Sequence, residues 1–95
     1  MLGVVATMQV KEGQEKAFET AMRDLQRQVQ ANEPGCKLYA LHRAKAPRTY
    51  VMLERYESKA AFDAHGKTAH FQAAFPKLGA LLAAPPKIEV LEEVA

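Results

Sequence analysis

The stretch Glu54–Phe71, ERYESKAAFDAHGKTAHF, contains the change of period on which the fold prediction depends. Residues up to Glu57 alternate between two faces, as in a β-strand, whereas the residues after Ser58 have helical spacing. The Ser58 hydroxyl can accept a hydrogen bond from an otherwise unpaired N–H of a first helical turn. We therefore predict a strand that ends near Glu57 and a short helix over Lys59–His65 that Gly66 stops.

A strand and a long helix are predicted before this stretch. Residues Leu2–Val10 alternate with a period of two and have one fully apolar face. Residues Gln14–Ala31 form an amphipathic pattern that predicts a helix laid against a sheet. The turn Glu33-Pro34-Gly35 ends this helix, because proline cannot continue it. The apolar stripe of the helix consists of Phe18, Ala21, Met22, Leu25 and Val29.

Two further strands, Cys36–Ala44 and Thr49–Glu57, are joined by a connection short enough for an antiparallel hairpin. Both strands have large apolar side chains on both faces. A sheet of this kind needs cover on both sides, and the helices of one chain supply cover for only one. The uncovered face therefore points to a partner subunit.

After Thr68, a second helix-start residue, Phe71, Phe75 and Leu78 follow a helical spacing. Pro76 lies within that pattern and is expected to kink or restart the helix. A final strand is predicted over Lys87–Val94. The resulting order, β-α-β-β-α-β, predicts an α+β ferredoxin-like fold: a four-stranded antiparallel sheet with helices on one face, in a single domain over residues 1–95.

Composition excludes several classes of protein. The chain has 95 residues, 48% of them hydrophobic, a net charge of +2 and no run of basic residues, which argues against nucleic-acid binding. No segment approaches the roughly 20 apolar residues of a membrane span. The single cysteine, Cys36, precludes an internal disulfide and suits a reducing compartment, so a cytoplasmic location is expected. No motif for a metal, a nucleotide or a covalent nucleophile is present.

His65 has two interpretations. It is either a cap at the end of a helix, favoured by the helix dipole, or a proton donor or acceptor on the wall of an apolar pocket. His70 lies about 140° away around a regular helix and is expected on an outer face. Glu54 and Tyr56 should share a face of their strand and Arg55 the other, with a surface ion pair as the simplest role for the charged residues.

The run Glu54–His65, ERYESKAAFDAH, followed by His70-Phe71, resembles the antibiotic biosynthesis monooxygenase (ABM) domain, which includes quinol monooxygenases. The segment MQVKEGQEKAFE and the turn EPGC match as well, so the resemblance covers nearly the whole chain. It implies a dimeric α+β barrel in which two sheets pack face to face, with a ligand cavity between each sheet and its helices. Some members of this family oxidise polycyclic phenols or quinols with O₂ and without metal, flavin or haem.

The resemblance implies a cofactor-independent oxidation of a small aromatic quinol or phenol, a homodimer through the open sheet face, and no metal. Transferred to this chain, it makes His65 the acid–base residue. Two other functions stay open: an isomerase that acts on a small carbonyl compound without oxygen, and a non-catalytic dimer that binds an apolar ligand or serves a stress response. The cavity walls implied by the resemblance are Ala6, Met8, Leu25, Leu53, Phe71 and Phe75.

Overall fold

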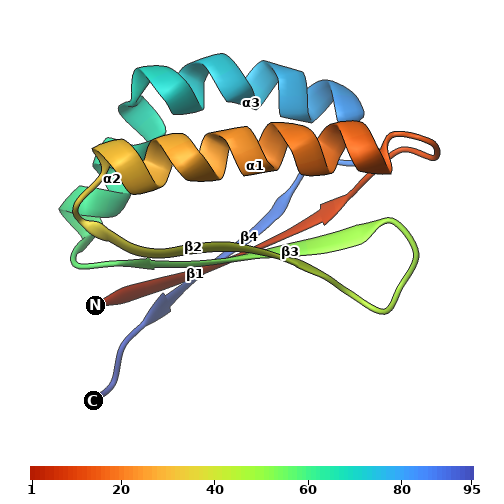
Figure 1. Ribbon diagram of the computed structural model, residues 1–95. Coiled ribbons are helices and arrows are strands. Elements are labelled where there is room, and N and C mark those ends of the chain that lie inside the picture. The colour runs from red at the N-terminus through yellow and green to blue at the C-terminus, as the bar shows by residue number, and fades with distance from the viewer.

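A computed structural model describes residues 1–95 and confirms the predicted ferredoxin-like α+β fold. One sheet lies on one side and all helices lie on the other (Figure 1). The second helical region is divided in two, so the order is β-α-β-β-α-α-β. The elements are β1 (Leu2–Gln9), α1 (Glu15–Asn32), β2 (Cys36–Arg43), β3 (Thr49–Tyr56), α2 (Lys59–Lys67), α3 (Ala69–Leu81) and β4 (Lys87–Glu92).

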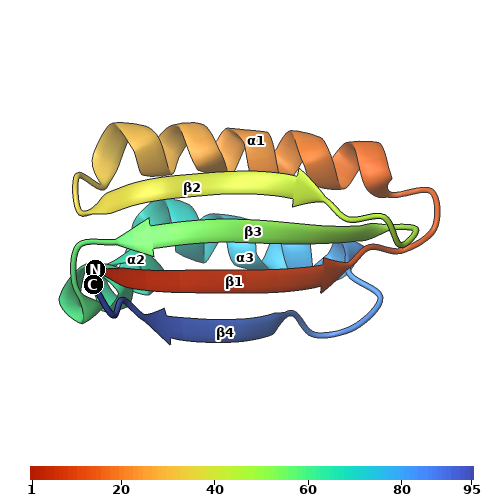
Figure 2. The ribbon, with the colours of Figure 1, turned by 90° about the horizontal axis from the view of Figure 1, so that it is seen from below.

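The four strands are antiparallel and lie in the order β2-β3-β1-β4 (Figure 2). Ala6 in β1 lies opposite Met52 in β3 and Ile88 in β4. Because side chains alternate along a strand, this register puts Ala6, Met52 and Ile88 on one face. That face is the one that the helices cover, and both chain termini lie at the same end of the sheet (Figure 2).

Helix α1 covers this face with the stripe that its sequence predicts. Phe18, Met22, Leu25 and Val29 are buried. Burial of each such side chain contributes about 1.5–3 kcal/mol. The ring of Phe18 also packs against Tyr50 of β3, with centroids 5.0 Å apart. Helix α1 is therefore held to the sheet mainly by its apolar stripe.

Ser58 and Thr68 each precede a helix, as predicted, but the predicted stop of α2 at Gly66 is wrong. The Ser58 hydroxyl accepts a hydrogen bond from the Ala61 N–H, and the Thr68 hydroxyl accepts one from the Phe71 N–H. Helix α2 continues through Gly66, since one glycine costs only about 1 kcal/mol in a helix. The break comes at Thr68, whose extended backbone ends α2 and begins α3.

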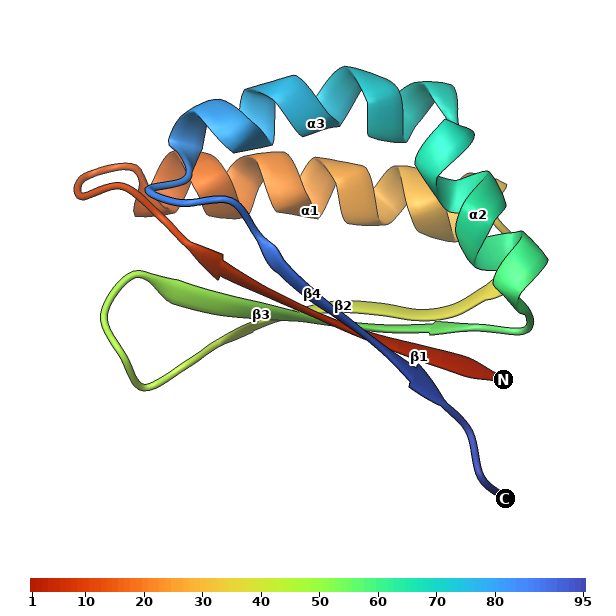
Figure 3. The same ribbon diagram turned by 180° about the vertical axis from the view of Figure 1, so that it is seen from behind.

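A restart of the helix at Pro76, one of the two outcomes expected there, is wrong, because α3 continues through Pro76 to Leu81. A proline inside a helix removes one backbone hydrogen bond. Leu78, two residues later, is buried against the core and helps to hold the helix in place. Helix α3 runs beside α1, and α2 turns down from it towards the end of β3 (Figure 3).

The other face of the sheet has no helix over it, and apolar side chains are exposed there. Leu38 and Leu91 are each 44% exposed, and Leu53 lies between their strands. A bulge in β2 between Cys36 and Leu38 moves Cys36 out of this face and towards the core. No helix of the structure is both long and apolar enough to cross a bilayer.

Candidate functional site

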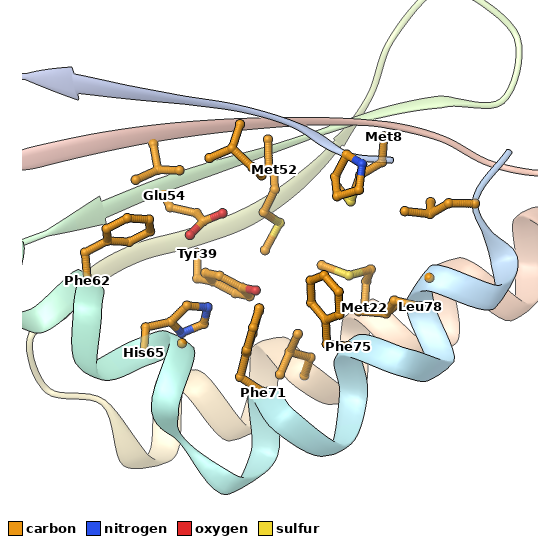
Figure 4. Close-up of a pocket in the computed structure, with 18 of the residues that line it drawn as sticks. Met8, Met22, Tyr39, Met52, Glu54, Phe62, His65, Phe71, Phe75 and Leu78 are labelled. Atoms are coloured by element: carbon orange, nitrogen blue, oxygen red, sulfur yellow. The ribbon is translucent and has the colours of Figure 1, made fainter. Parts of the chain in front are cut away.

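A cavity of about 450 Å³ lies between the sheet and the helices, and every strand and helix contributes to its walls (Figure 4). Most of its lining is apolar. Phe75 and Ile88, which are about half exposed, belong to the lining and mark where it meets the surface. The volume falls in the range of small-molecule binding sites.

All but one of the predicted apolar walls line this cavity: Ala6, Met8, Leu25, Phe71 and Phe75. The exception is Leu53, whose placement in the cavity is wrong. Leu53 lies opposite Val5 and Ala40 on the open face of the sheet. Its neighbour Met52 points into the cavity instead, because successive side chains of a strand point to opposite faces.

His65 lines the cavity from α2 and is only 4% exposed. Its ring packs among aromatic rings, with centroids 5.3 Å from Tyr39 and 4.8 Å from Phe71 (Figure 4). Its Nδ1 lies 2.9 Å and 3.0 Å from the two carboxylate oxygens of Glu33. Of the two interpretations of His65, this geometry favours the pocket wall over a simple helix cap.

His70 approaches the same carboxylate, so its predicted position on an outer face is wrong. Its Nε2 lies 2.5 Å from Glu33 Oε2, and its side chain is only 9% exposed. The chain changes direction at Thr68, so the regular-helix angle between His65 and His70 does not apply. Glu33 is the C-cap of α1, where the sequence indicates only the end of a helix.

Glu54 also lines the cavity, from β3, so the surface ion-pair interpretation is wrong for this residue. Tyr56 donates a hydrogen bond of 2.6 Å to Glu54 Oε1, and the two side chains share a face as predicted. Arg55 points to the other face and pairs with Glu93. Burial, and secondarily the charge of Glu33, raise the pKa of Glu54 from 4.5 to about 7, although the Tyr56 hydrogen bond lowers it.

Two further groups near the site stay protonated. The Tyr39 hydroxyl points into the cavity (Figure 4), and burial together with the charges of Glu54 and Glu33 raises its pKa. Burial, with the same two carboxylates, raises the pKa of the Cys36 thiol to about 11. No group of three or more His, Cys, Asp or Glu side chains is arranged to hold a metal ion.

The arrangement combines an apolar binding space with two ionisable side chains. His65 approaches the cavity from the helical side and Glu54 from the sheet. A histidine ring can donate or accept a proton, and burial raises the pKa of Glu54 to about 7. A small aromatic molecule with an acidic hydroxyl would meet both apolar walls and proton acceptors here.

Comparison with known proteins places this chain among relatives of the same architecture. The family model described as "Antibiotic biosynthesis monooxygenase" matches residues 1–77. The Bacillus subtilis (strain 168) protein named "Putative monooxygenase YcnE" is 31% identical over 85 residues, which cover 90% of each chain.

Solved structures are similar to this chain as well. A crystal structure from Caulobacter crescentus, described as "a putative antibiotic biosynthesis monooxygenase", is 42% identical, with a TM-score of 0.95, and the match covers 99% of this chain and 90% of that one. The structure of PA3566 from Pseudomonas aeruginosa is 30% identical, with a TM-score of 0.87, and the match covers 99% and 94% of the two chains. The chain belongs to the antibiotic biosynthesis monooxygenase family.

Proposed function

We propose that this chain is a cofactor-independent monooxygenase that oxidises a small aromatic quinol or phenol with O₂. The observation that carries the proposal is the position of His65, a titratable side chain on the wall of an apolar cavity of about 450 Å³ in a chain of this family. Met52, Phe71 and Phe75 offer apolar contacts to a planar ring. Such a site favours an aromatic substrate with few polar groups.

In the first proposed step, His65 Nε2 takes the proton of the substrate's phenolic hydroxyl. Nδ1 is occupied by Glu33, so Nε2 is the nitrogen left for a ligand. The resulting phenolate is electron-rich at its ring carbons. The apolar walls exclude water from it, which strengthens its interaction with the charged ring of His65.

In the second step, the anion transfers electrons to O₂, and a ring carbon that bears a hydrogen forms a bond to oxygen. The hydroperoxide then loses that hydrogen as a proton while its O–O bond breaks. The carbon becomes a carbonyl with one oxygen atom, and the other oxygen leaves as water. The sum is substrate plus O₂ giving a quinone-type product plus H₂O, with O₂ as the only oxidant.

We propose Glu54 as the group that protonates the departing oxygen. With a pKa raised to about 7, it holds a proton in a large share of molecules at neutral pH. It reaches the cavity from the sheet, whereas His65 reaches it from α2. Protonated His65 supplies the hydrogen of the hydroperoxide, and the proton released from the ring carbon returns to Glu54. Both side chains therefore recover their starting state, and the balance of the reaction is complete.

We further propose that the open sheet face packs against the same face of a second copy. Leu38, Leu53 and Leu91 provide apolar surface there, and no helix of the chain covers it. The functional unit would include all of residues 1–95. Pro86 and Ile88, which lie beyond the residues that the family model matches, line the cavity, and β4 completes the sheet beside β1.

Oxygen uptake by metal-stripped protein with a panel of quinols and hydroxynaphthalenes tests the proposal, with autoxidation subtracted. We expect uptake that saturates with one class of substrate and falls about 10²–10⁴-fold in His65→Ala. Lys67→Ala is the control, because Lys67 is exposed on the same helix as His65 and does not line the cavity. Equal rates in folded His65→Ala and Lys67→Ala would rule out His65 as the base.

The presence of two proton-exchanging groups also favours a second function, isomerisation of a small carbonyl compound. One group would remove a proton and the other would return it to a different carbon, with no net oxidation. Turnover of enolisable ketones under nitrogen would support this function. It would replace the oxygenase proposal if the quinol panel showed no uptake above autoxidation.

A further inference from the structure

We propose that Glu33 and His70 are positioning residues that fix the tautomer of His65, so that its basic nitrogen faces the cavity. The proposal rests on the proposed function in treating His65 as the base. Neither residue lines the cavity, and each would act only through His65. No feature of the sequence alone connects the three residues.

The three side chains form a buried cluster from separate parts of the chain. Glu33 follows the last turn of α1, His65 lies near the end of α2, and His70 lies at the start of α3. Their side chains are 9%, 5% and 9% exposed. A buried carboxylate is costly unless hydrogen-bond donors satisfy it, so both rings are expected to donate to Glu33.

Donation to a carboxylate determines where the hydrogen lies on each neutral ring. The hydrogen of His65 is on Nδ1, because this is the atom that contacts both oxygens of Glu33. The lone pair is then on Nε2, which has no hydrogen-bond partner in the protein. Only one side-chain nitrogen or oxygen atom is both fully buried and without a hydrogen-bond partner, and it is Glu15 Oε1. Since His65 Nε2 also lacks a partner, it is not fully buried, and a ligand can reach it.

The same contact stabilises His65 after it has taken a proton. Uptake at Nε2 makes the ring a cation, with its Nδ1–H against the negative charge of Glu33. Proton transfer moves one positive charge from the substrate, which becomes an anion, to the ring of His65, which becomes a cation. His70 donates from Nε2 to Glu33 Oε2 and so prevents the carboxylate from turning away from His65.

A purely structural role makes different predictions. Glu33 could serve only as a clamp that ties the end of α1 to α2 and α3. Loss of a clamp that did not depend on the Nδ1–H of His65 would lower stability but would not alter which nitrogen of His65 carries the hydrogen. The tautomer is therefore the decisive observable, and it can be measured whether or not the protein turns over a substrate.

The experiment uses protein labelled with ¹⁵N in histidine and two-bond ¹H–¹⁵N spectra, recorded at a pH where the rings are neutral. The signals of His65 are assigned as those that disappear in the spectrum of His65→Ala. We expect Nδ1–H and a bare Nε2 in the wild type, and a mixture of tautomers in Glu33→Ala. A wild-type His65 with its hydrogen on Nε2 would overturn the proposal, as would folded Glu33→Ala with an unchanged tautomer.

A second pair of variants keeps the proposal testable if Glu33→Ala does not fold. His70→Gln retains an N–H donor in place of Nε2, whereas His70→Ala removes it. We expect kcat for quinol oxidation to fall about tenfold in His70→Ala, the effect of losing one hydrogen bond to a charged group, with KM little changed. His70→Gln should recover kcat to within about threefold of wild type.

The two proposals fail in distinguishable ways. If wild-type protein oxidises no quinol, the proposed function is wrong, and the tautomer of His65 still decides the role of Glu33. If oxidation occurs but His70→Gln is as slow as His70→Ala, the hydrogen bond from His70 does not position the carboxylate. Thermal melting of every variant separates loss of turnover from loss of fold.

Discussion

Replacement of Glu54 by glutamine should stabilise the protein, and it should do so only above mildly acidic pH. Glu54 lies in the wall of an apolar cavity, where burial raises its pKa from 4.5 to about 7. Its ionised form is therefore less favourable in the folded protein than in the unfolded chain. Glutamine carries no charge, and its oxygen can still accept the hydrogen bond from Tyr56.

The size of the effect follows from the two pKa values. Below pH 4.5 the carboxyl is protonated in both states and costs nothing. Between pH 4.5 and 7 the unfolded chain releases this proton while the folded protein retains it, so the wild type loses about 1.4 kcal/mol per pH unit. Above pH 7 both states are ionised and the loss is constant, at about 3 kcal/mol. Glu54→Gln avoids this loss.

Urea unfolding at a fixed protein concentration, at pH 4.5, 6, 7 and 8, measures the difference. We expect Glu54→Gln to match the wild type near pH 4.5 and to exceed it by about 2–3 kcal/mol at pH 8. Glu12→Gln, at an exposed position in the turn after β1, serves as the control and should show no such trend. A constant difference across this range, or a less stable Glu54→Gln at pH 8, would refute the assigned environment of Glu54.

Three other substitutions test the fold and the interface. Phe18→Ala empties a fully buried position and should lower the free energy of unfolding by about 3–5 kcal/mol, measured in urea; a loss below 1 kcal/mol would contradict the packing of α1. Ser58→Ala removes the cap of α2 and should cost about 1 kcal/mol, whereas Ser58→Asp should retain most of it; equal losses would argue against the cap. Leu53→Glu should convert a dimer to a monomer in sedimentation without loss of ligand binding, and an unchanged sedimentation coefficient would remove Leu53 from the proposed interface.

The fold could be predicted from the sequence because its signals are local. Alternation defines the strands, and the stripe of α1 places Phe18 and Leu25 in the core. The hydroxyls of Ser58 and Thr68 mark helix starts that the structure confirms. Each of these signals depends on residues within a few positions of one another.

The polar part of the site could not be predicted, because its contacts join distant residues. Glu33 lies 32 positions from His65 and 37 from His70, and its own context indicates only the end of a helix. Residues 65 and 70 converge because the chain turns at Thr68, a change that regular-helix geometry does not describe.

The misplacement of Leu53 has a different physical reason. β3 has large apolar side chains on both faces, so alternation separates Leu53 from Met52 without showing which face the helices cover. The register with β1 decides the matter, since Met52 lies opposite Ala6. The same alternation groups Glu54 with Met52, which was the available signal that Glu54 could reach the cavity.

Single-turnover oxidation under ¹⁸O₂ tests the central claim most directly. Metal-stripped protein is mixed with the best quinol of the panel, quenched quickly to limit carbonyl exchange with water, and analysed by mass spectrometry. We predict one labelled oxygen atom in each product molecule, no hydrogen peroxide, and loss of the labelled product in folded His65→Ala. Unlabelled product accompanied by hydrogen peroxide would show a simple oxidase, and product formed equally well under nitrogen would contradict the oxygenase altogether.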